Sequence, residues 1–461
     1  MGAGLWAWML LGCRSPEPEP EPVVAAPAPA DAPNVVVVSL DTMRSDRLTP
    51  YGYGRDTTPF LQELADKGAV FTESYAQAPM TTPSHASMFS GLFPFENHTF
   101  KTTHRLPAEI QTIAETFQAS GYTTFARASS IRFHPSIDFV QGFEDYKAYW
   151  DMPKNRRSDQ VIGEVHAFAA EQHEQPVFAF VHLFDPHAPY NAPEPYASTW
   201  TTLREDFPPI RSVDYVRANR GARASVDIAD LKYIQDLYDG GLRFTDQKLR
   251  DLVEGTTFPN KRSTIWVITS DHGEAFKEHG YLGHSKWLYE EIMRVPLVVV
   301  WEGELSGGQS HAIPTQSVDL YPTLVDLVGL TGPEGLSGRS LAGPLRGDLA
   351  ALAQPSEAVE DPLLLMANRR DWSVIATVQG RRFKLVNYHG EPRRLFDLTA
   401  DPSGFIDVSE RHSRIGKILL DYARQRGVLR KPGAPADNTR EVSSDEIDML
   451  RALGYVDGEE H

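Results

Sequence analysis

Short apolar runs with strand character alternate with helical patterns along most of this 461-residue chain. Val35–Leu40 is the first such run, and a helical pattern from Thr58 to Gly68 follows it. Alternation of this kind predicts a largely parallel central sheet with helices on both faces, an α/β fold. Further strands are expected at 122–126, 177–184, 264–269 and 296–301, and further helices at 107–120, 158–173, 227–253, 415–425 and 445–453.

Polar side chains follow three of these expected strands. Asp41 comes directly after the first strand, Asp271 and His272 follow the strand at 264–269, and His187 follows the strand at 177–184. Ligands of open α/β sheets bind outside the carboxyl ends of the strands. We therefore expect these side chains to lie close together at one edge of the sheet.

Thr81 stands where a helix is expected to begin. Pro83 suits the first helical turn, and Gly91 suits the end of the helix. A hydroxyl at a helix N-terminus lies in a positive field beside backbone N–H groups, which favours both an alkoxide and a bound oxyanion.

Four segments occur in the order found in the sulfatase family, a branch of the alkaline phosphatase superfamily. They are Asp41-Thr-Met-Arg44, Thr81-Thr-Pro-Ser-His85, Pro186-His-Ala-Pro-Tyr190 and Ser270-Asp-His-Gly-Glu274. The resemblance runs from about residue 35 to residue 300, with a weaker similarity beyond. It implies an alkaline-phosphatase-like α/β fold, a small C-terminal antiparallel sheet and a sulfuric ester hydrolase. Short strand patterns at 372–378, 382–387 and 394–397 agree with that small sheet.

The residues that match these motifs predict a centre for one divalent metal ion. Asp41, Asp271, His272 and Thr81 would supply two carboxylates, one imidazole and one alkoxide. A metal ion can activate a hydroxyl that is otherwise a poor nucleophile, and it can polarise the ester. We expect Thr81 to form a covalent sulfo- or phospho-threonine, which water then cleaves.

The sequence departs from the sulfatase pattern at this centre. Thr81 occupies the position where the family carries the Cys or Ser that becomes formylglycine, so no formylglycine is expected. His85 replaces the motif arginine, Thr42 replaces the second carboxylate after the first strand, and His272 replaces an asparagine. An imidazole in place of a carboxylate favours manganese or zinc over the calcium that the resemblance implies.

Further catalytic candidates are histidines and one lysine. Besides His85, the resemblance implies that His187 contacts the ester oxygens or protonates the leaving group. It also places a basic residue near the leaving group, and spacing does not choose between His284 and Lys286; His284 could instead bind a second metal ion. His182 lies inside an apolar strand and could be an ordinary core histidine.

Three functions fit these residues. Hydrolysis of a sulfuric ester comes first, on the resemblance. The substitutions at the centre favour a phosphodiester or phosphonate hydrolase, or a transferase of the phosphoethanolamine or phosphoglycerol type from the same superfamily. A function of another class is an inactive lipoprotein that binds anionic glycans, although all four metal-site positions carry competent residues.

The formal net charge of −17 bears on partners. A phosphate backbone needs a basic surface, so nucleic acid is not expected as a partner. An anionic ester of a glycan, lipid or small molecule must be attracted locally, against the overall field.

The N-terminal region indicates attachment to a membrane through lipid alone. Leu10-Leu-Gly-Cys13 resembles the lipobox of bacterial lipoproteins, and the preceding apolar run is too short to span a bilayer. We expect a signal at 1–13 with lipidation of Cys13, and a Pro- and Glu-rich tether at 14–33. A catalytic domain at 34–330 and a C-terminal α+β subdomain at 331–461 would then lie at the bacterial cell envelope, in the periplasm or at the cell surface.

Overall fold

The computed structural model describes residues 27–149, 154–171, 173–219, 225–348, 360–366, 368, 370–428 and 439. Cys13, the expected signal at 1–13, most of the expected tether at 14–33 and the helix expected at 445–453 lie outside these residues. No helix in the described part combines the length and the apolar character needed to cross a membrane.

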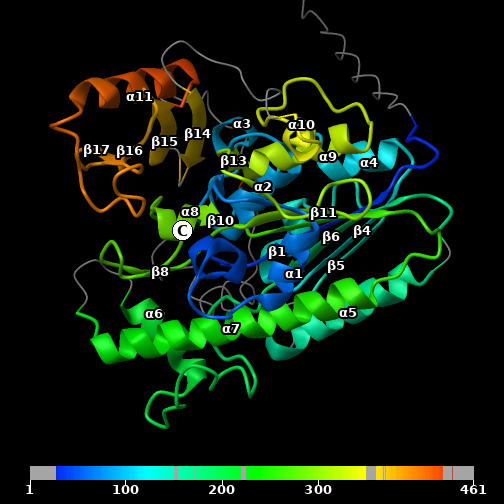
Figure 1. Ribbon diagram of the computed structural model, residues 1–461, viewed down its shortest axis with the longest axis horizontal. Helices are drawn as coiled ribbons and strands as arrows, with labels where there is room; N and C mark the ends of the chain where they lie inside the picture. Colours follow the sequence, from blue (N-terminus) through cyan, green and yellow to red (C-terminus); the bar gives the residue numbers. More distant parts are fainter. Residues whose placement is uncertain are drawn as a thin grey trace, which may run out of the picture.

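An eight-stranded sheet forms the centre of the described residues, in the order β12-β2-β11-β7-β1-β6-β4-β5 (Figure 1). Its strands from β7 to β5 run parallel to one another, whereas β11 runs antiparallel to β7 and to β2. The predicted α/β fold with a mostly parallel sheet is confirmed. The strand bounds are β1 Asn34–Leu40, β2 Ala69–Phe71, β4 Thr123–Ala128, β5 Asp145–Ala148, β6 Val177–Leu183, β7 Thr264–Thr269, β11 Leu297–Trp301 and β12 Gln309–His311.

Helices cover both faces of this sheet (Figure 1). One face carries α1 (Pro59–Lys67), α5 (Lys154–Ala169) and α7 (Ile228–Gly255). The other carries α2 (Thr81–Ser90), α4 (Ile113–Ala119) and α9 (Leu320–Leu327). The remaining helices are α3 Pro94–Asn97, α6 Ser212–Ala218, α8 Glu290–Met293 and α10 Ala342–Leu345, with 3-10 turns η1 Ser45–Arg47, η2 Thr49–Tyr51, η3 Ile131–Phe133, η4 Pro135–Ile137, η5 Pro209–Arg211 and η6 Ser317–Asp319.

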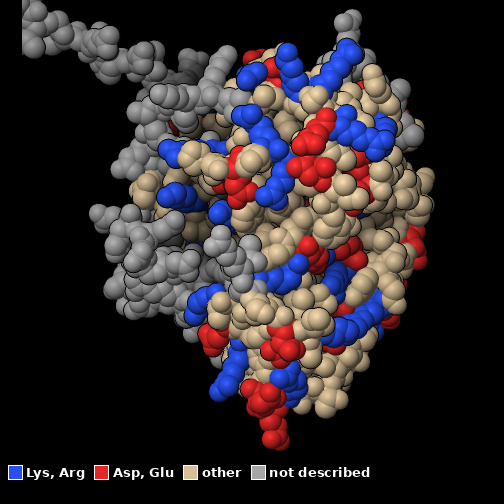
Figure 2. Space-filling model, turned by 90° about the vertical axis from the view of Figure 1, so that its left-hand side faces the viewer, with Lys and Arg blue, Asp and Glu red and all other residues tan. Residues whose placement is uncertain are grey.

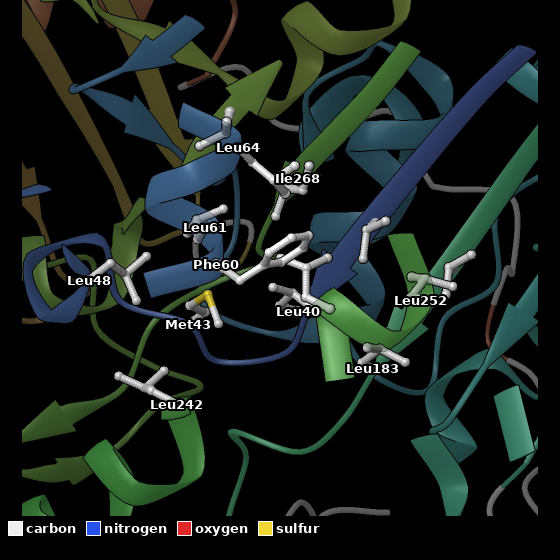
Figure 3. Close-up of a cluster of buried hydrophobic side chains, with 14 of the residues drawn as sticks. Leu40, Met43, Leu48, Phe60, Leu61, Leu64, Leu183, Leu242, Leu252 and Ile268 are labelled. Atoms are coloured by element: carbon white, nitrogen blue, oxygen red, sulfur yellow. The ribbon is translucent and has the colours of Figure 1, made fainter. Parts of the chain in front are cut away.

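The side chains of β1 explain why its sequence is an unbroken apolar run. Val35 and Val37 point into the cluster beneath α2 and α4, while Val36 and Val38 point into the cluster beneath α1 and α7. A parallel strand buried on both faces has no polar side to show. Figure 3 shows the second cluster, in which Leu40 and Ile268 from neighbouring strands meet side chains from the helices.

A four-stranded antiparallel sheet makes up the C-terminal subdomain, in agreement with the prediction of a small sheet there. Its order is β14-β15-β16-β17, with bounds Glu360–Met366, Trp372–Val378, Arg381–Asn387 and Arg394–Asp397. Helix α11 (Ser413–Gln425) packs on this sheet through Leu419 and Ala423. The backbone N–H of Leu288 donates to the Tyr388 hydroxyl (2.8 Å), which joins the subdomain to the catalytic part.

Two small sheets lie beside the main one among the described residues. The three-stranded sheet has the order β10-β3-β13, and β8 pairs with β9. Their bounds are β3 Ser74–Tyr75, β8 Ala275–Phe276, β9 Leu282–Gly283, β10 Arg294–Val295 and β13 Thr315–Gln316.

The structure differs from the sequence predictions at some element ends. The helix expected at 107–120 begins only at Ile113, because Thr112 forms a capping box with Glu115. Residues 27–33 of the expected tether lie against the catalytic part: Arg262 donates to the carbonyl oxygens of Ala30 and Ala32 (2.8 and 2.9 Å).

Candidate active site

The carboxyl ends of β1, β6 and β7 bring the predicted polar residues together. β1 pairs in parallel with β6 on one side and with β7 on the other. Asp41 follows β1, and its backbone N–H donates to the carbonyl oxygen of Leu183 at the end of β6 (3.0 Å). Asp271 and His272 follow β7. These three side chains are completely buried.

An unusual backbone conformation at Thr42 joins the first and last of these strand ends. Thr42 has a φ of 56°, in the left-handed region that a β-branched residue rarely adopts. In that conformation its backbone N–H donates to Oδ1 of Asp271 (3.3 Å). Strained residues of this kind persist where the surrounding structure holds them, and they are frequent at functional sites.

Thr81 is the first residue of α2, as the sequence predicted, and Gly91 ends the helix with a φ of 65°. The Oγ1 atom of Thr81 lies 3.5 Å from Nε2 of His272. Ser84, in the first turn, donates to the carbonyl oxygen of Asp271 (2.7 Å). This bond fixes the start of α2 against the loop that carries Asp271 and His272.

Asp41, Asp271 and His272 fit a divalent metal ion. Their ligand atoms lie within 4.8 Å of one another, and Oδ2 of Asp271 accepts no hydrogen bond. That atom is 3.3 Å from Nε2 of His272. Two ligands bonded to one ion at about 2.1 Å with tetrahedral angles are about 3.4 Å apart. The spacings of His272 to Asp271 and to Thr81 both match this value.

The histidines around Asp271 control its protonation. Burial alone would raise the pKa of the Asp271 carboxyl, but His272, His85 and His182 outweigh it and hold the pKa at about 2. Burial likewise disfavours the charged form of His272, yet the carboxylates of Asp271 and Asp41 raise its pKa above the ordinary value. Asp271 is therefore ionised, which is the form that binds a cation.

His85 lies one turn after Thr81, with both ring nitrogens in hydrogen bonds. Nδ1 donates to the carbonyl oxygen of Thr81 (2.8 Å), and Nε2 accepts from the hydroxyl of Ser39 (2.9 Å). Burial lowers the pKa of His85 to about 3, so the ring is neutral. Its hydrogen bonds hold the backbone of α2 to β1.

His182 is a buried neighbour of the metal site that the sequence did not separate from a core histidine. Its Nε2 lies 3.4 Å from Oδ2 of Asp41, and burial lowers its pKa to about 4. His85, His182 and Asp271 form a second group with ligand spacing. Because both nitrogens of His85 are engaged, only His182 and Asp271 could serve an ion there, which is too few ligands.

The other predicted bases divide into two kinds. The ring of His284 packs against His272, with 4.4 Å between ring centroids, and against His187 at 5.0 Å. Nδ1 of His187 donates to the carbonyl oxygen of Ala188 (2.7 Å). Lys286, in contrast, is exposed, and its ammonium lies 4.7 Å from the centre of the Trp287 ring. The geometry therefore places His284 against the side chains of His272 and His187, whereas Lys286 is exposed.

Sequence reasoning gave no role to Glu274 or Tyr190, although both stand in the quoted motifs. The Glu274 carboxylate accepts from Nδ1 of His284 (2.9 Å) through Oε1 and from the Tyr190 hydroxyl (2.9 Å) through Oε2. All three side chains are buried. The one sequence feature that pointed to these two residues was their place in the motifs at 186–190 and 270–274.

A sequence model of the family described as "Sulfatase" matches residues 33–330. The chain belongs to the sulfatase family. A second model, described as "N-sulphoglucosamine sulphohydrolase, C-terminal", matches residues 277–420. This sulfatase is thus a hydrolase that acts on ester bonds, in a family that depends on a metal ion.

Similar proteins agree over nearly the whole chain. A Delta 4,5-hexuronate-2-O-sulfatase of Bacteroides thetaiotaomicron is 22% identical over 434 residues, covering 85% of this chain and 87% of that protein. The structure of a 2-O GAG sulfatase has a TM-score of 0.70 at 20% identity, covering 89% of this chain and 98% of the other. Phosphonate monoester hydrolase of Agrobacterium radiobacter has a TM-score of 0.67 at 21% identity, with coverages of 86% and 95%. The structural likenesses show the fold.

Proposed function

We propose that this sulfatase hydrolyses a sulfuric ester through a covalent intermediate on Thr81. The observation that supports this most directly is the position of Thr81, at the start of α2 and 3.5 Å from His272. Asp41, Asp271 and His272 would hold one divalent metal ion, with Thr81 beside it. When bound, this ion supplies activation of the hydroxyl and polarisation of the ester.

The residues of the chain provide the rest of the reaction. In the first step, Oγ1 of Thr81 bonds to sulfur as the bond from sulfur to the leaving oxygen breaks, and the hydroxyl proton of Thr81 is transferred to that oxygen. In the second step, water attacks sulfur as the bond from sulfur to Oγ1 breaks, and a proton of the water is transferred to Oγ1. The backbone N–H groups at the start of α2 favour the negative charge on the transferred group. His284, packed on His272, lies where it can pass protons between the ester, water and solvent.

A phosphodiester or phosphonate substrate is the second candidate, and the centre itself favours it. Threonine cannot form the aldehyde of formylglycine, and the imidazole of His272 suits manganese or zinc better than calcium. Transfer of a phosphoethanolamine- or phosphoglycerol-type group would share the first step. In the second step, an acceptor other than water would attack the intermediate. An inactive glycan-binding function fits less well, because all four groups of the centre are assembled.

The substrate would be an anionic ester carried by a glycan, a lipid or a small molecule. On the face drawn in Figure 2, basic and acidic side chains are interspersed. Because the chain has a formal net charge of −17, attraction of an anion would come from the centre, against the overall field. An N-terminal lipid on Cys13 would hold the enzyme at the bacterial cell envelope.

A parallel rate assay tests these proposals. The full chain is assayed with 4-nitrophenyl sulfate and bis(4-nitrophenyl) phosphate in the presence of calcium, manganese or zinc, beside Thr81→Ala and the conservative Thr81→Ser. The first candidate is supported if the protein has sulfatase activity, Thr81→Ala abolishes it and Thr81→Ser keeps part of it. Phosphodiesterase activity with the same dependence supports the second. Activity that survives in Thr81→Ala contradicts the covalent mechanism in both.

A further inference from the structure

Beyond the four groups of the predicted centre, a buried hydrogen-bond network surrounds Glu274. Its backbone N–H donates to the carbonyl oxygen of Glu291 (3.1 Å), and its own carbonyl oxygen accepts from Nη1 of Arg44 (2.9 Å). Its two carboxylate oxygens accept from Tyr190 and His284. Backbone and side chain are thus held from four directions.

This network holds the ring of His284. The carboxylate accepts the proton on Nδ1 of His284, which in the neutral ring leaves Nε2 as the basic nitrogen. Nε2 lies on the side of the ring turned away from Glu274. The ring itself packs on His272, whose Nε2 contacts Thr81.

The contrast with His187 supports this interpretation. His187 donates from Nδ1 to a neutral backbone carbonyl, whereas His284 donates to a carboxylate that is 1% exposed. A carboxylate partner stabilises a positive charge on the imidazole, which a neutral carbonyl does only weakly. Of the two rings, His284 is the one whose Nδ1 is bound to a carboxylate.

We propose that Glu274 is a positioning residue that fixes the tautomer and orientation of His284, with Tyr190 fixing Glu274 in turn. This inference rests on the proposed function. In the first step, Nε2 of His284 takes the hydroxyl proton of Thr81 as Oγ1 bonds to the central atom, and it passes that proton to the leaving oxygen as the bond from the central atom to that oxygen breaks. In the second step, Nε2 takes a proton from the attacking water and returns it to Oγ1 of Thr81 as the bond from Oγ1 to the central atom breaks. Nδ1 of His284 keeps its proton in both steps and donates it in the hydrogen bond to Glu274.

The first test compares leaving groups. Glu274→Gln keeps the shape of the side chain and one accepting oxygen but removes its charge. For phenyl esters, whose leaving group needs a proton, we expect kcat to fall by about 100-fold, with KM little changed. For 4-nitrophenyl esters, which leave without help, the fall is expected to be several-fold smaller. An equal loss on both esters overturns the proposal.

Tyr190→Phe should show the same pattern with a smaller loss, about 10-fold on phenyl esters. Tyr53→Phe is the matched control, because it removes a similar bond from a tyrosine to a buried carboxylate, Asp239, outside this network (2.7 Å). A His284→Ala, Glu274→Gln double variant should be no slower than His284→Ala alone, because Glu274 acts through that ring. Additive losses contradict this coupling.

The second test needs no activity, so failure of the proposed function can be told apart from failure of this inference. Long-range proton–nitrogen NMR spectra of the ¹⁵N-histidine-labelled full chain report which ring nitrogen carries the proton. The His284 signals are those missing in His284→Asn. Neutral His284 should carry its proton on Nδ1, and Glu274→Ala should abolish that preference. A proton on Nε2 in the unmodified protein overturns the proposal, whether or not any ester is cleaved.

Discussion

Two groups of histidines flank the nucleophile, and they differ in what surrounds them. His85 and His182 lie among phenylalanines: Phe133 is 4.7 Å from His85 and 4.5 Å from His182 between ring centroids. His272 and His284 have carboxylate neighbours, Asp271 at 3.3 Å and Glu274 at 2.9 Å. In the first group His182 also has one, Asp41 at 3.4 Å, in addition to its phenylalanine neighbour. All four imidazoles are buried, so burial alone does not assign a role.

The partner of each ring decides its charge and therefore its use. Burial keeps His85 and His182 neutral, with pKa values of about 3 and 4, whereas carboxylates raise the pKa of His272. In the first group, His85 holds the backbone around Thr81 in place. For the second group we propose the roles of metal ligand and proton carrier. The comparison predicts that the first group governs stability and the second governs turnover.

Asp271→Asn should have the largest effect, because it removes the carboxylate that the metal site and three histidines share. We expect loss of bound metal and a fall in kcat/KM of at least about 10⁴-fold. Elemental analysis after dialysis measures the metal, with Asp319→Asn as the control for changing a buried carboxylate elsewhere. Retention of stoichiometric metal by Asp271→Asn would contradict the assigned site.

His284→Ala should lower kcat by about 10³-fold through loss of the proton carrier, with little change in melting temperature. Rates on the phenyl and 4-nitrophenyl esters and a thermal melt measure the two quantities. If the variant melts far below the unmodified protein, His284 belongs with the structural group and the comparison breaks down.

His85→Ala should reverse that balance. It removes two buried hydrogen bonds and leaves a cavity among phenylalanines, so the free energy of unfolding should fall by about 3 kcal/mol. Denaturant titration measures the change. A variant as stable as the unmodified protein, with catalysis lost, would move His85 into the catalytic group.

Asp319 sharpens the comparison as a fully buried carboxylate with no imidazole partner. Burial raises the pKa of Asp319 to about 6, although hydrogen bonds from the backbone N–H groups of Arg339 and Gln316 act to lower it. The histidines, in contrast, hold the pKa of Asp271 at about 2. Below pH 4 Asp319 is protonated in both the folded and unfolded states and contributes no penalty. As the pH rises from 4 to 6, the unfolded state ionises first, so the stability contribution of Asp319 falls by about 2 kcal/mol. Unfolding titrations across this range should show that fall, and Asp319→Asn should lack it; parallel profiles of the two proteins would refute the assignment.

Ser39→Ala should have the smallest effect, about 1 kcal/mol of stability, because it removes only the hydroxyl that donates to Nε2 of His85. In a His85→Ala background the same change should have almost no effect. A full and independent loss in the double variant would mean that Ser39 stabilises something other than His85.

The sequence predicted the parts of this molecule whose causes are local. The strand at 264–269, the start of α2 at Thr81 and its end at Gly91 follow from apolar runs, Pro83 and a left-handed glycine. The bound at 107 was wrong because the capping box at Thr112 outweighed the helical pattern before it. Strand β14 was not predicted at all.

The parts that sequence reasoning could not supply depend on contacts between distant residues. The motifs located Asp41, Thr81, Asp271 and His272, and the strand register brought the carboxylates and His272 together. Spacing could not choose between His284 and Lys286, since the choice depends on which side chain meets Glu274. The bond between Tyr190 and Glu274 joins residues 84 positions apart, and no local pattern predicts it.

The register of β6, β1 and β7 has a consequence for biosynthesis. Asp41 is made early, but its strand obtains its second neighbour only when β7 has left the ribosome, and His272 follows directly after β7. Pairing across such a separation is slow compared with local folding. The nascent chain must therefore carry Asp41 and Thr81 through most of translation before an ion can be captured. A chain stopped between residues 187 and 264 would contain the nucleophile and still have no catalytic centre.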